Sequence, residues 1–180
     1  MNYYFADSHF GHANIIRMSK RPFENIEKMN ATMIDNWNNQ VKNDNDDVYI
    51  VGDLFYKSGD PVPVLKQLKG KKHLIVGNHD GSILKNPVAK RFFVEIKDML
   101  TIWEEKQMIV LCHYPMIEWN GYFRDSIHLY GHIHNNTQND TYTIMKNRKN
   151  AYNVGADILS YAPRTLEEVI QMNKEFFKNN

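Results

Sequence analysis

The sequence predicts a layered α/β fold in which two sheets pack face to face and helices cover the outside. Three observations predict it. Short apolar runs alternate with helical periodicity in the first half of the chain, and short apolar runs dominate the second half. Five of these runs end in residues of metal-binding types, at the strand ends where loops of an α/β fold gather ligands.

The first half of the chain predicts three strands and two helices. Three compact apolar runs predict strands, at residues 3–6, 48–51 and 74–76. An amphipathic helix is expected over residues 25–42, because apolar side chains recur there at three- and four-residue steps. A shorter helix is expected over residues 61–68, with proline in its first turn and Gly70 after its end.

The second half predicts a series of strands and a closing helix. The strands are expected at residues 92–96, 99–104, 108–112, 127–130, 142–145 and 151–154. An aromatic loop over residues 114–126 separates two of them. The closing helix is expected over about residues 166–177, where Thr165 and Glu168 have the spacing of a capping box. No linker interrupts the chain, so we expect one domain over residues 1–180 without a cap domain.

Composition and charge exclude several classes of protein. The hydrophobic fraction of 42% is enough for a buried core, and the net charge is only +1, without long basic runs. A protein that binds duplex nucleic acid through a broad basic face has a more lopsided charge. No apolar run approaches the ~20 residues that span a bilayer, and the first residues resemble a strand rather than a signal peptide. We therefore expect a cytoplasmic protein without a membrane partner, and the sequence carries no signal for an oligomeric state.

Seven side chains of metal-binding types stand at five successive strand ends, each beside a glycine or a turn. They are Asp7 and His9, then Asp53, Asn78 and His113, then His132 and His134. Residues two apart on an extended segment point to the same side, so Asp7 and His9 can reach one ion, and His132 and His134 lie on one face of their segment. Each motif alone has an ordinary reading as a turn or a surface histidine, but all five together favour a metal site. A neutral asparagine among them favours an open hydrolytic site over a structural zinc site, which uses cysteine thiolates.

In chain order the motifs read D-x-H, G-D, G-N-H-D, H and G-H-x-H, and this pattern resembles the calcineurin-like metallophosphoesterases. The motifs run from Asp7 to His134. Segments at residues 7–17, 21–23 and 153–163, together with Trp119, further resemble a compact prokaryotic and phage branch of predicted phosphoesterases. The resemblance implies a four-layer α/β/β/α sandwich, with two mixed β-sheets flanked by helices.

The resemblance also implies a role for each site residue. One divalent ion would be held by Asp7, His9, Asp53 and His134, and a second by Asp53, Asn78, His113 and His132. Asp53 would bridge the two ions. His79 would contact the phosphate and protonate the leaving oxygen, and Asp80 would support His79 through a hydrogen bond. Manganese is the first expectation for both ions, and iron, nickel or zinc are alternatives that the same donor set binds.

The implied reaction is hydrolysis of a phosphate monoester or diester, in a small molecule or a nucleotide. A hydroxide bridging the two metals would attack in line, since two cations lower the pKa of a shared water from ~15.7 towards neutrality. A metal-dependent nuclease that acts on DNA or RNA ends is one alternative. A catalytically silent scaffold with the same fold is another.

Several residues outside the motifs have open roles. His12, Arg17 and Arg21 are expected as contacts to a substrate phosphate, with a solvated loop histidine and surface ion pairs as the alternatives. The aromatic loop over residues 114–126 either stacks a base or packs the fold, and packing is favoured. Four residues are expected to be structural or to form turns: His73, His128, Asn153 and Asp157.

Overall fold

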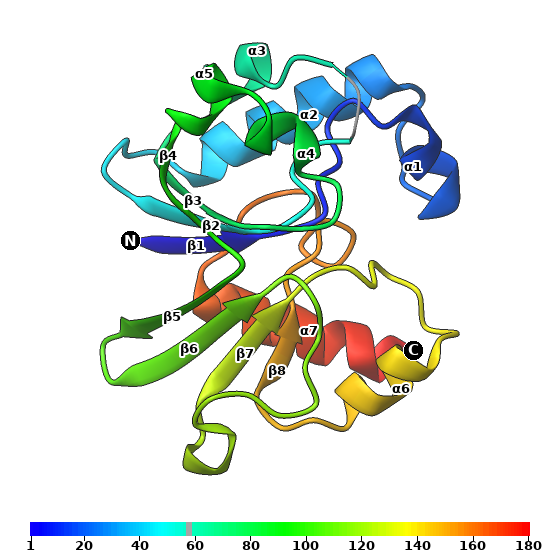
Figure 1. The fold of residues 1–180 in the computed structure, drawn as a ribbon. Coiled ribbons are helices and arrows are strands. Elements are labelled where there is room, and N and C mark those ends of the chain that lie inside the picture. The colour runs from blue at the N-terminus through cyan, green and yellow to red at the C-terminus, as the bar shows by residue number, and fades with distance from the viewer. Residues whose placement is uncertain (57–58) are drawn as a thin grey trace.

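Two four-stranded sheets flanked by helices make up the computed structural model, which describes residues 1–56 and 59–180 (Figure 1). Five helices lie on the outer side of the first sheet, and two lie against the second (Figure 1). The α/β/β/α layering expected from the sequence is therefore correct. No helix of the described residues is long and apolar enough to cross a membrane.

The first sheet has the strand order β1-β2-β3-β4 and is fully parallel, not mixed as the resemblance implies. Its strands are β1 (Asn2–Phe5), β2 (Asp47–Val51), β3 (Lys71–Ile75) and β4 (Phe93–Lys97). Its helices are α1 (Ala13–Met18), α2 (Ile26–Gln40), α3 (Val62–Leu65), α4 (Gly81–Leu84) and α5 (Pro87–Lys90). Right-handed crossovers between strands added in sequence order place every connecting helix on one face. The other face is therefore left free for the second sheet.

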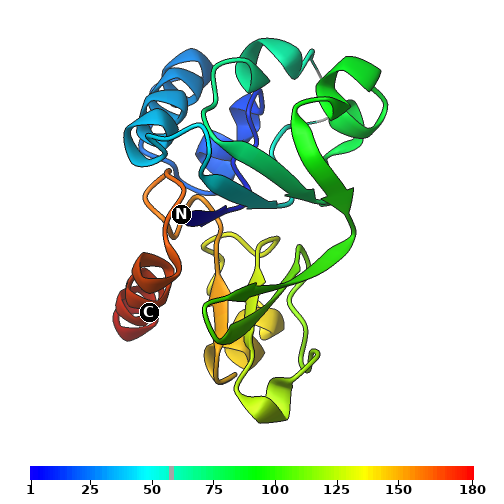
Figure 2. The ribbon, with the colours of Figure 1, turned by 90° about the vertical axis from the view of Figure 1, so that its left-hand side faces the viewer.

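The second sheet has the order β5-β6-β7-β8 and is mixed. Its strands are β5 (Met99–Glu104), β6 (Gln107–Cys112), β7 (Ile127–Tyr130) and β8 (Ala151–Asn153). The first two form an antiparallel hairpin, and the others pair in parallel. The helices are α6 (Asp140–Lys146) and α7 (Leu166–Asn179), and Tyr122–Arg124 form a 3-10 turn. In Figure 2, α7 stands beside β8, and the buried side chain of Asn173 on α7 hydrogen-bonds to both backbone groups of Asn153.

Each expected strand and helix has a counterpart in the structure except at one place. Residues 142–145, expected as a strand, belong to helix α6. The side chain of Asn139 caps this helix by accepting a 2.7 Å hydrogen bond from the Tyr142 N–H, and Tyr142 and Met145 share its buried face. The expected capping box at Thr165 and Glu168 is confirmed. The short helices α1, α4 and α5 were not expected, because four to six residues are too few for a periodic pattern.

The packing of the two sheets brings one set of strand ends together. Tyr4 of β1 is fully buried and donates a hydrogen bond to Glu104 of β5, which ties the sheets at one side. Ala6, directly after β1, forms a bridge with Gly155, which follows β8. The loops that follow β1, β2, β3, β6 and β7 consequently lie near one another and hold the residues described next.

Candidate metal centre

The backbone at the strand ends is held in a conformation that side chains rarely adopt. Five of the seven predicted ligands have positive φ: Asp7 (53°), His9 (52°), Asp53 (54°), His132 (72°) and His134 (51°). Left-handed backbone at a residue other than glycine costs about 1–3 kcal/mol, and such residues cluster at functional sites. The strain aims each side chain away from its strand and towards a common centre.

Glycines in the motifs allow the acidic side chains to approach the neighbouring loops. A Cβ on Gly77 would lie 2.3 Å from the Asp53 Oδ1, and a Cβ on Gly131 would lie 2.7 Å from the Asp7 Oδ2. Real Cβ atoms do not approach other atoms so closely. Gly77 and Gly131 are therefore required by the carboxylates that lie against them.

The first group of donor atoms comes from Asp7, His9 and His134. One atom from each lies within 4.8 Å of the others. The two imidazoles are stacked, and the Nε2 atoms of His9 and His134 are 3.3 Å apart. Both oxygens of Asp7 also accept hydrogen bonds from the His132 N–H, which fixes the carboxylate.

The second group comes from Asp53, Asn78, His113 and His132. The His113 Nε2 lies 3.4 Å from the Asp53 Oδ2 and 3.2 Å from the Asn78 Oδ1. The His132 Nδ1 lies 3.2 Å from the same amide oxygen. The Asp53 Oδ2 is also 3.7 Å from the His9 Nε2. Asp53 therefore lies between the two groups, and donor atoms of Asp7, Asp53 and His113 also lie within 4.8 Å of one another.

The proposed ligands fit a cation, because their hydrogen-bond acceptor atoms face one another. The His113 Nδ1 is 2.9 Å from the Val51 carbonyl oxygen, which can only accept, so Nδ1 carries the proton. In the neutral ring the Nε2 lone pair then points at a carboxylate oxygen and an amide oxygen. Such a contact is repulsive unless a proton or a metal ion lies between the atoms.

The charges of the metal-free site are consistent with this. Burial opposes protonation of His113, but a hydrogen bond to Asp53 and the charges of Asp7 and Asp53 outweigh it and raise its pKa to about 9. Burial and the nearby His134 instead lower the pKa of His9 to about 2. His9 is thus neutral and ready to bind a metal, whereas His113 must lose a proton first.

A buried network holds His134 in place. The His134 Nδ1 is 2.8 Å from the Asp157 Oδ2, and Arg21 binds the same carboxylate through its Nε (2.8 Å) and Nη2 (3.2 Å). Burial favours the neutral acid, but the hydrogen bond from His134 and the charge of Arg21 lower the pKa of Asp157. The carboxylate therefore accepts a hydrogen bond from the Nδ1–H of His134 and leaves Nε2 free for a metal. Asn153 adds a 2.9 Å hydrogen bond to the His134 carbonyl.

Arg21 lies in a different place from the expected substrate contact. Its side chain is fully buried, and it donates to the carbonyls of Ser8 (2.8 Å) and Asp7 (2.6 Å) in addition to Asp157. Arg21 therefore fixes the strained loop from within, and a substrate phosphate could reach it only by breaking these bonds. Arg17 lies exposed on α1.

Two histidines lie beside the donor groups. The ring of His79 is centred 5.3 Å from that of His9, and its backbone N–H donates a 2.7 Å hydrogen bond to the Asp53 Oδ1. His12 stacks on Tyr56, with ring centroids 3.7 Å apart, and lies 5.5 Å from His9. The Nδ1 atoms of His9, His12 and His79 are buried and have no hydrogen-bond partner among the described residues.

The expected support of His79 by Asp80 requires a correction. The Asp80 carboxylate accepts hydrogen bonds from three backbone N–H groups, those of Asp53 (2.9 Å), Leu54 (3.0 Å) and Gly77 (2.8 Å). Burial raises the pKa of the Asp80 carboxyl to about 6, against the effect of these donors. Asp80 thus joins the loops that follow β2 and β3, because the strained turns leave these donors without backbone partners.

The aromatic loop over residues 114–126 packs into the fold at Trp119, whereas its Phe123 is 84% exposed. Trp119 is buried, donates to the Ser126 carbonyl (3.3 Å) and lies against His128. Tyr114 is half exposed, and its ring centroid is 4.7 Å from that of His132. His128 and His73 lie outside the centre, and both ring nitrogens of each have hydrogen-bond partners.

Sequence reasoning missed Asp157 and Tyr56 as parts of the site. The signal for Asp157 was its position shortly after β8, in the segment 153–163 that carries part of the family resemblance. A carboxylate that follows a strand of the same sheet as His134 is placed to reach that imidazole. Tyr56 follows the Asp53 loop by three residues, and its aromatic type alone carried no signal.

Comparisons with known proteins give the following similarities. No protein-family model matches the chain. The uncharacterized protein MJ1445 of Methanocaldococcus jannaschii is 34% identical over 173 residues, which cover 94% of the chain and 89% of that protein. The crystal structure of AQ665, a protein of unknown function from Aquifex aeolicus, has a TM-score of 0.73 and 25% identity, and the match covers 96% of the chain and 98% of AQ665. Pseudomonas putida nuclease MPE matches at a TM-score of 0.47 and 21% identity over 74% of the chain and 60% of its own, a likeness too low to support an argument.

Proposed function

The chain belongs to the same family as the Methanocaldococcus jannaschii protein MJ1445, and from its site we propose that it is a dinuclear metal-dependent hydrolase of phosphate esters. The proposed ligands are Asp7, His9, Asp53 and His134 for one ion and Asp53, Asn78, His113 and His132 for the other. The proposed ions are divalent, with manganese first. The substrate is a phosphate monoester or diester, and the chain acts as one domain without a cap.

One observation carries this proposal. The Asp53 Oδ2 has a donor group on either side of it, with the His9 Nε2 at 3.7 Å and the His113 Nε2 at 3.4 Å. A single carboxylate oxygen between two clusters of imidazole and amide donors suits two cations that share a ligand. Two ions a few ångströms apart are typical of sites for phosphoryl transfer.

Each residue type then has a chemical task. When bound, the two ions would activate a water and neutralise charge on the phosphate oxygens. The ring of His79 is half-buried and lies beside that of His9, so this residue is available to contact the phosphate and to give a proton to the leaving oxygen. Asp80 holds the Asp53 and Gly77 backbone and so keeps the loop of His79 in register with the bridging carboxylate.

Two other functions compete with this proposal. A nuclease acting on DNA or RNA ends uses the same metal chemistry, and the polar cleft beside His132 and His134 keeps it as the second candidate. A silent scaffold with this fold needs no metal. The complete donor set and the strained backbone at five of its members argue against that function, because strain is retained where it serves a site.

The test is a hydrolysis screen of protein reconstituted with Mn, Ni or Zn. The substrates are a nitrophenyl phosphate monoester, a nitrophenyl diester, cyclic nucleotides and short oligonucleotides. We expect at least one class to be hydrolysed, and inactivity with all three metals on all four classes would refute the proposal. The variant His79→Ala should bind the same amount of metal and lose about 10²–10⁴-fold in kcat. Metal content measured on the same samples separates loss of His79 chemistry from loss of the ions.

A further inference from the structure

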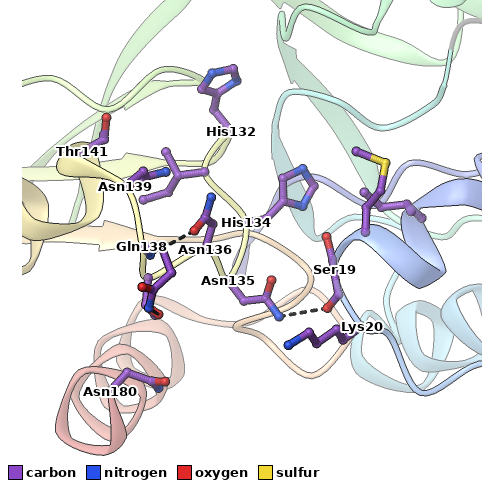
Figure 3. A pocket seen from close by; sticks show the side chains of 14 residues that line it. Ser19, Lys20, His132, His134, Asn135, Asn136, Gln138, Asn139, Thr141 and Asn180 are labelled. Carbon is purple, nitrogen blue, oxygen red and sulfur yellow. Dashed lines mark hydrogen bonds between the residues drawn. The ribbon is translucent and has the colours of Figure 1, made fainter.

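A polar cleft opens directly beside the metal centre (Figure 3). Its volume is about 730 Å³, and it lies between the end of α1 and the loop that follows β7. Side chains of His132 and His134 form one wall. A group bound in this cleft would therefore be continuous with a phosphate bound at the metals. The volume falls in the usual range for a small-molecule ligand, roughly 300–1,000 Å³.

Two amide side chains of the cleft, Asn136 and Asn139, offer N–H groups. The Asn136 Oδ1 accepts a 3.0 Å hydrogen bond from the Gln138 N–H, and the Asn139 Oδ1 accepts a 2.7 Å hydrogen bond from the Tyr142 N–H. Each of these oxygens is thus used to form the loop or to cap α6. What remains to face a ligand is the Nδ2 group of each side chain, which only donates.

The side-chain charge that the described residues bring to the cleft is positive. Lys20 contributes an ammonium group and Thr141 a hydroxyl, and among the described residues no aspartate or glutamate side chain lines the cleft. Figure 3 shows Lys20 and the Asn135 amide next to each other, where the Asn135 Nδ2 donates to the Ser19 carbonyl at 3.0 Å. A site with N–H donors, a cation and no carboxylate favours an anionic oxygen-rich group over a neutral or cationic one.

We propose that this cleft binds a second phosphate group of the substrate, next to the phosphate that is hydrolysed. The proposal rests on the phosphoesterase function proposed above and narrows its substrate class to molecules with at least two phosphates. Such a molecule is either a nucleotide with phosphates on both ends of the sugar, including a short oligonucleotide, or a polyphosphate. Both present the same anionic oxygens to Asn136, Asn139 and Lys20.

The experiment compares two chromogenic substrates with the same scissile bond. One is the p-nitrophenyl ester of thymidine 5′-phosphate, and the other carries a further phosphate on the 3′-hydroxyl. We expect kcat/KM of the metal-loaded protein to be at least about tenfold higher for the second substrate, as for one charge-assisted contact. Equal values for the two substrates would refute binding of a second phosphate in the cleft but leave the phosphoesterase function standing. Absence of hydrolysis of both, and of every substrate in the screen, would refute the function itself.

Matched variants tie the preference to the cleft. Asn136→Asp and Asn139→Asp keep the acceptor oxygen that forms the loop or caps the helix, while each replaces the N–H donor by a negative charge. Each should reduce the ratio of kcat/KM values towards one. Asn25→Asp is the control, because Asn25 caps α2 by the same type of bond, is exposed, and does not line the cleft. A preference that survives both cleft variants, or that falls equally in the control, would overturn the assignment.

Binding without turnover gives a second readout. Calorimetry on the metal-free protein should show tighter binding of thymidine 3′,5′-bisphosphate than of thymidine 5′-phosphate, and Asn136→Asp should remove the difference. Inorganic tripolyphosphate distinguishes the two sources of the ligand. If it competes with the bisphosphate at equal concentration, the cleft binds phosphate groups alone, and if it does not, the nucleoside is part of the ligand. Equal affinity for the two thymidine nucleotides would contradict the proposal.

Discussion

Replacement of Asp157 by asparagine should weaken metal binding through a residue that does not touch the metal. The change keeps the size of the side chain and removes its charge. If the amide oxygen stays with Arg21, the amide N–H₂ faces the His134 Nδ1 and donates to it. His134 must then carry its proton on Nε2, the atom that faces His9, and that atom can no longer bind an ion.

The expected magnitude follows from the burial of the network. Loss of a partner that orients a metal-binding histidine typically costs 10–100-fold in metal affinity, about 1.4–2.7 kcal/mol. The side chains of Arg21 and Asp157 are both fully buried, and breaking such a pair costs about 3–5 kcal/mol of stability. For a chain of this size the second effect lowers Tm by roughly 6–20 °C.

The assay is chelator competition at equilibrium, combined with thermal unfolding of the metal-free protein. Asp125→Asn is the matched control, since Asp125 pairs with Lys149 on the exposed surface and should change neither quantity. The double variant Arg21→Met/Asp157→Asn removes the unpaired buried charge, so it should regain part of the stability. An Asp157→Asn protein that folds and binds metal as tightly as the parent would refute the reasoning.

Three further outcomes are expected. Metal affinity should rise about tenfold per pH unit up to pH ~9 and then level off. The pKa of His113 is raised, so below this pH the metal must displace the proton of that imidazole. A flat profile in chelator titrations would contradict this. Gly77→Ala should lower metal affinity, since its Cβ would lie 2.3 Å from the Asp53 Oδ1, whereas Gly81→Ala meets nothing within 4 Å and should leave affinity unchanged in the same titration. When free metal is present at 100 times its dissociation constant, its removal should lower the free energy of unfolding by about 2.7 kcal/mol. This should be seen as a fall in Tm on adding chelator.

The strands and their carboxyl ends could be predicted because both depend on local sequence. Apolar runs fixed β1, β2 and β7 to within a few residues, and the site residues follow them directly. Residues 142–145 were misassigned because Tyr, Thr and Ile favour strands by propensity. The segment forms a helix instead, because Asn139 caps it and because Tyr142 and Met145 lie on one buried face.

The network behind His134 could not be predicted, because it depends on contacts between distant positions. Arg21 and Asp157 are 136 positions apart in the chain. An arginine near the first motif has the type and the position of a phosphate contact, and only burial distinguishes it from one that holds the loop. The left-handed backbone at Asp7, Asp53 and His134 could not be predicted for the same reason. The surrounding fold imposes this conformation on residues that lack the conformational freedom of glycine.

The site draws on both halves of the chain. Asp7, His9, Asp53 and Asn78 follow strands of the first sheet, and His113, His132 and His134 follow strands of the second, with one crossing of the chain at Asp98 between β4 and β5. Neither sheet alone holds a full set of donors for either proposed ion. Fragments 1–98 and 99–180, made separately, would each bind metal poorly, and metal would favour their reassembly. The ions would thus hold the two halves of the protein together as well as take part in the reaction.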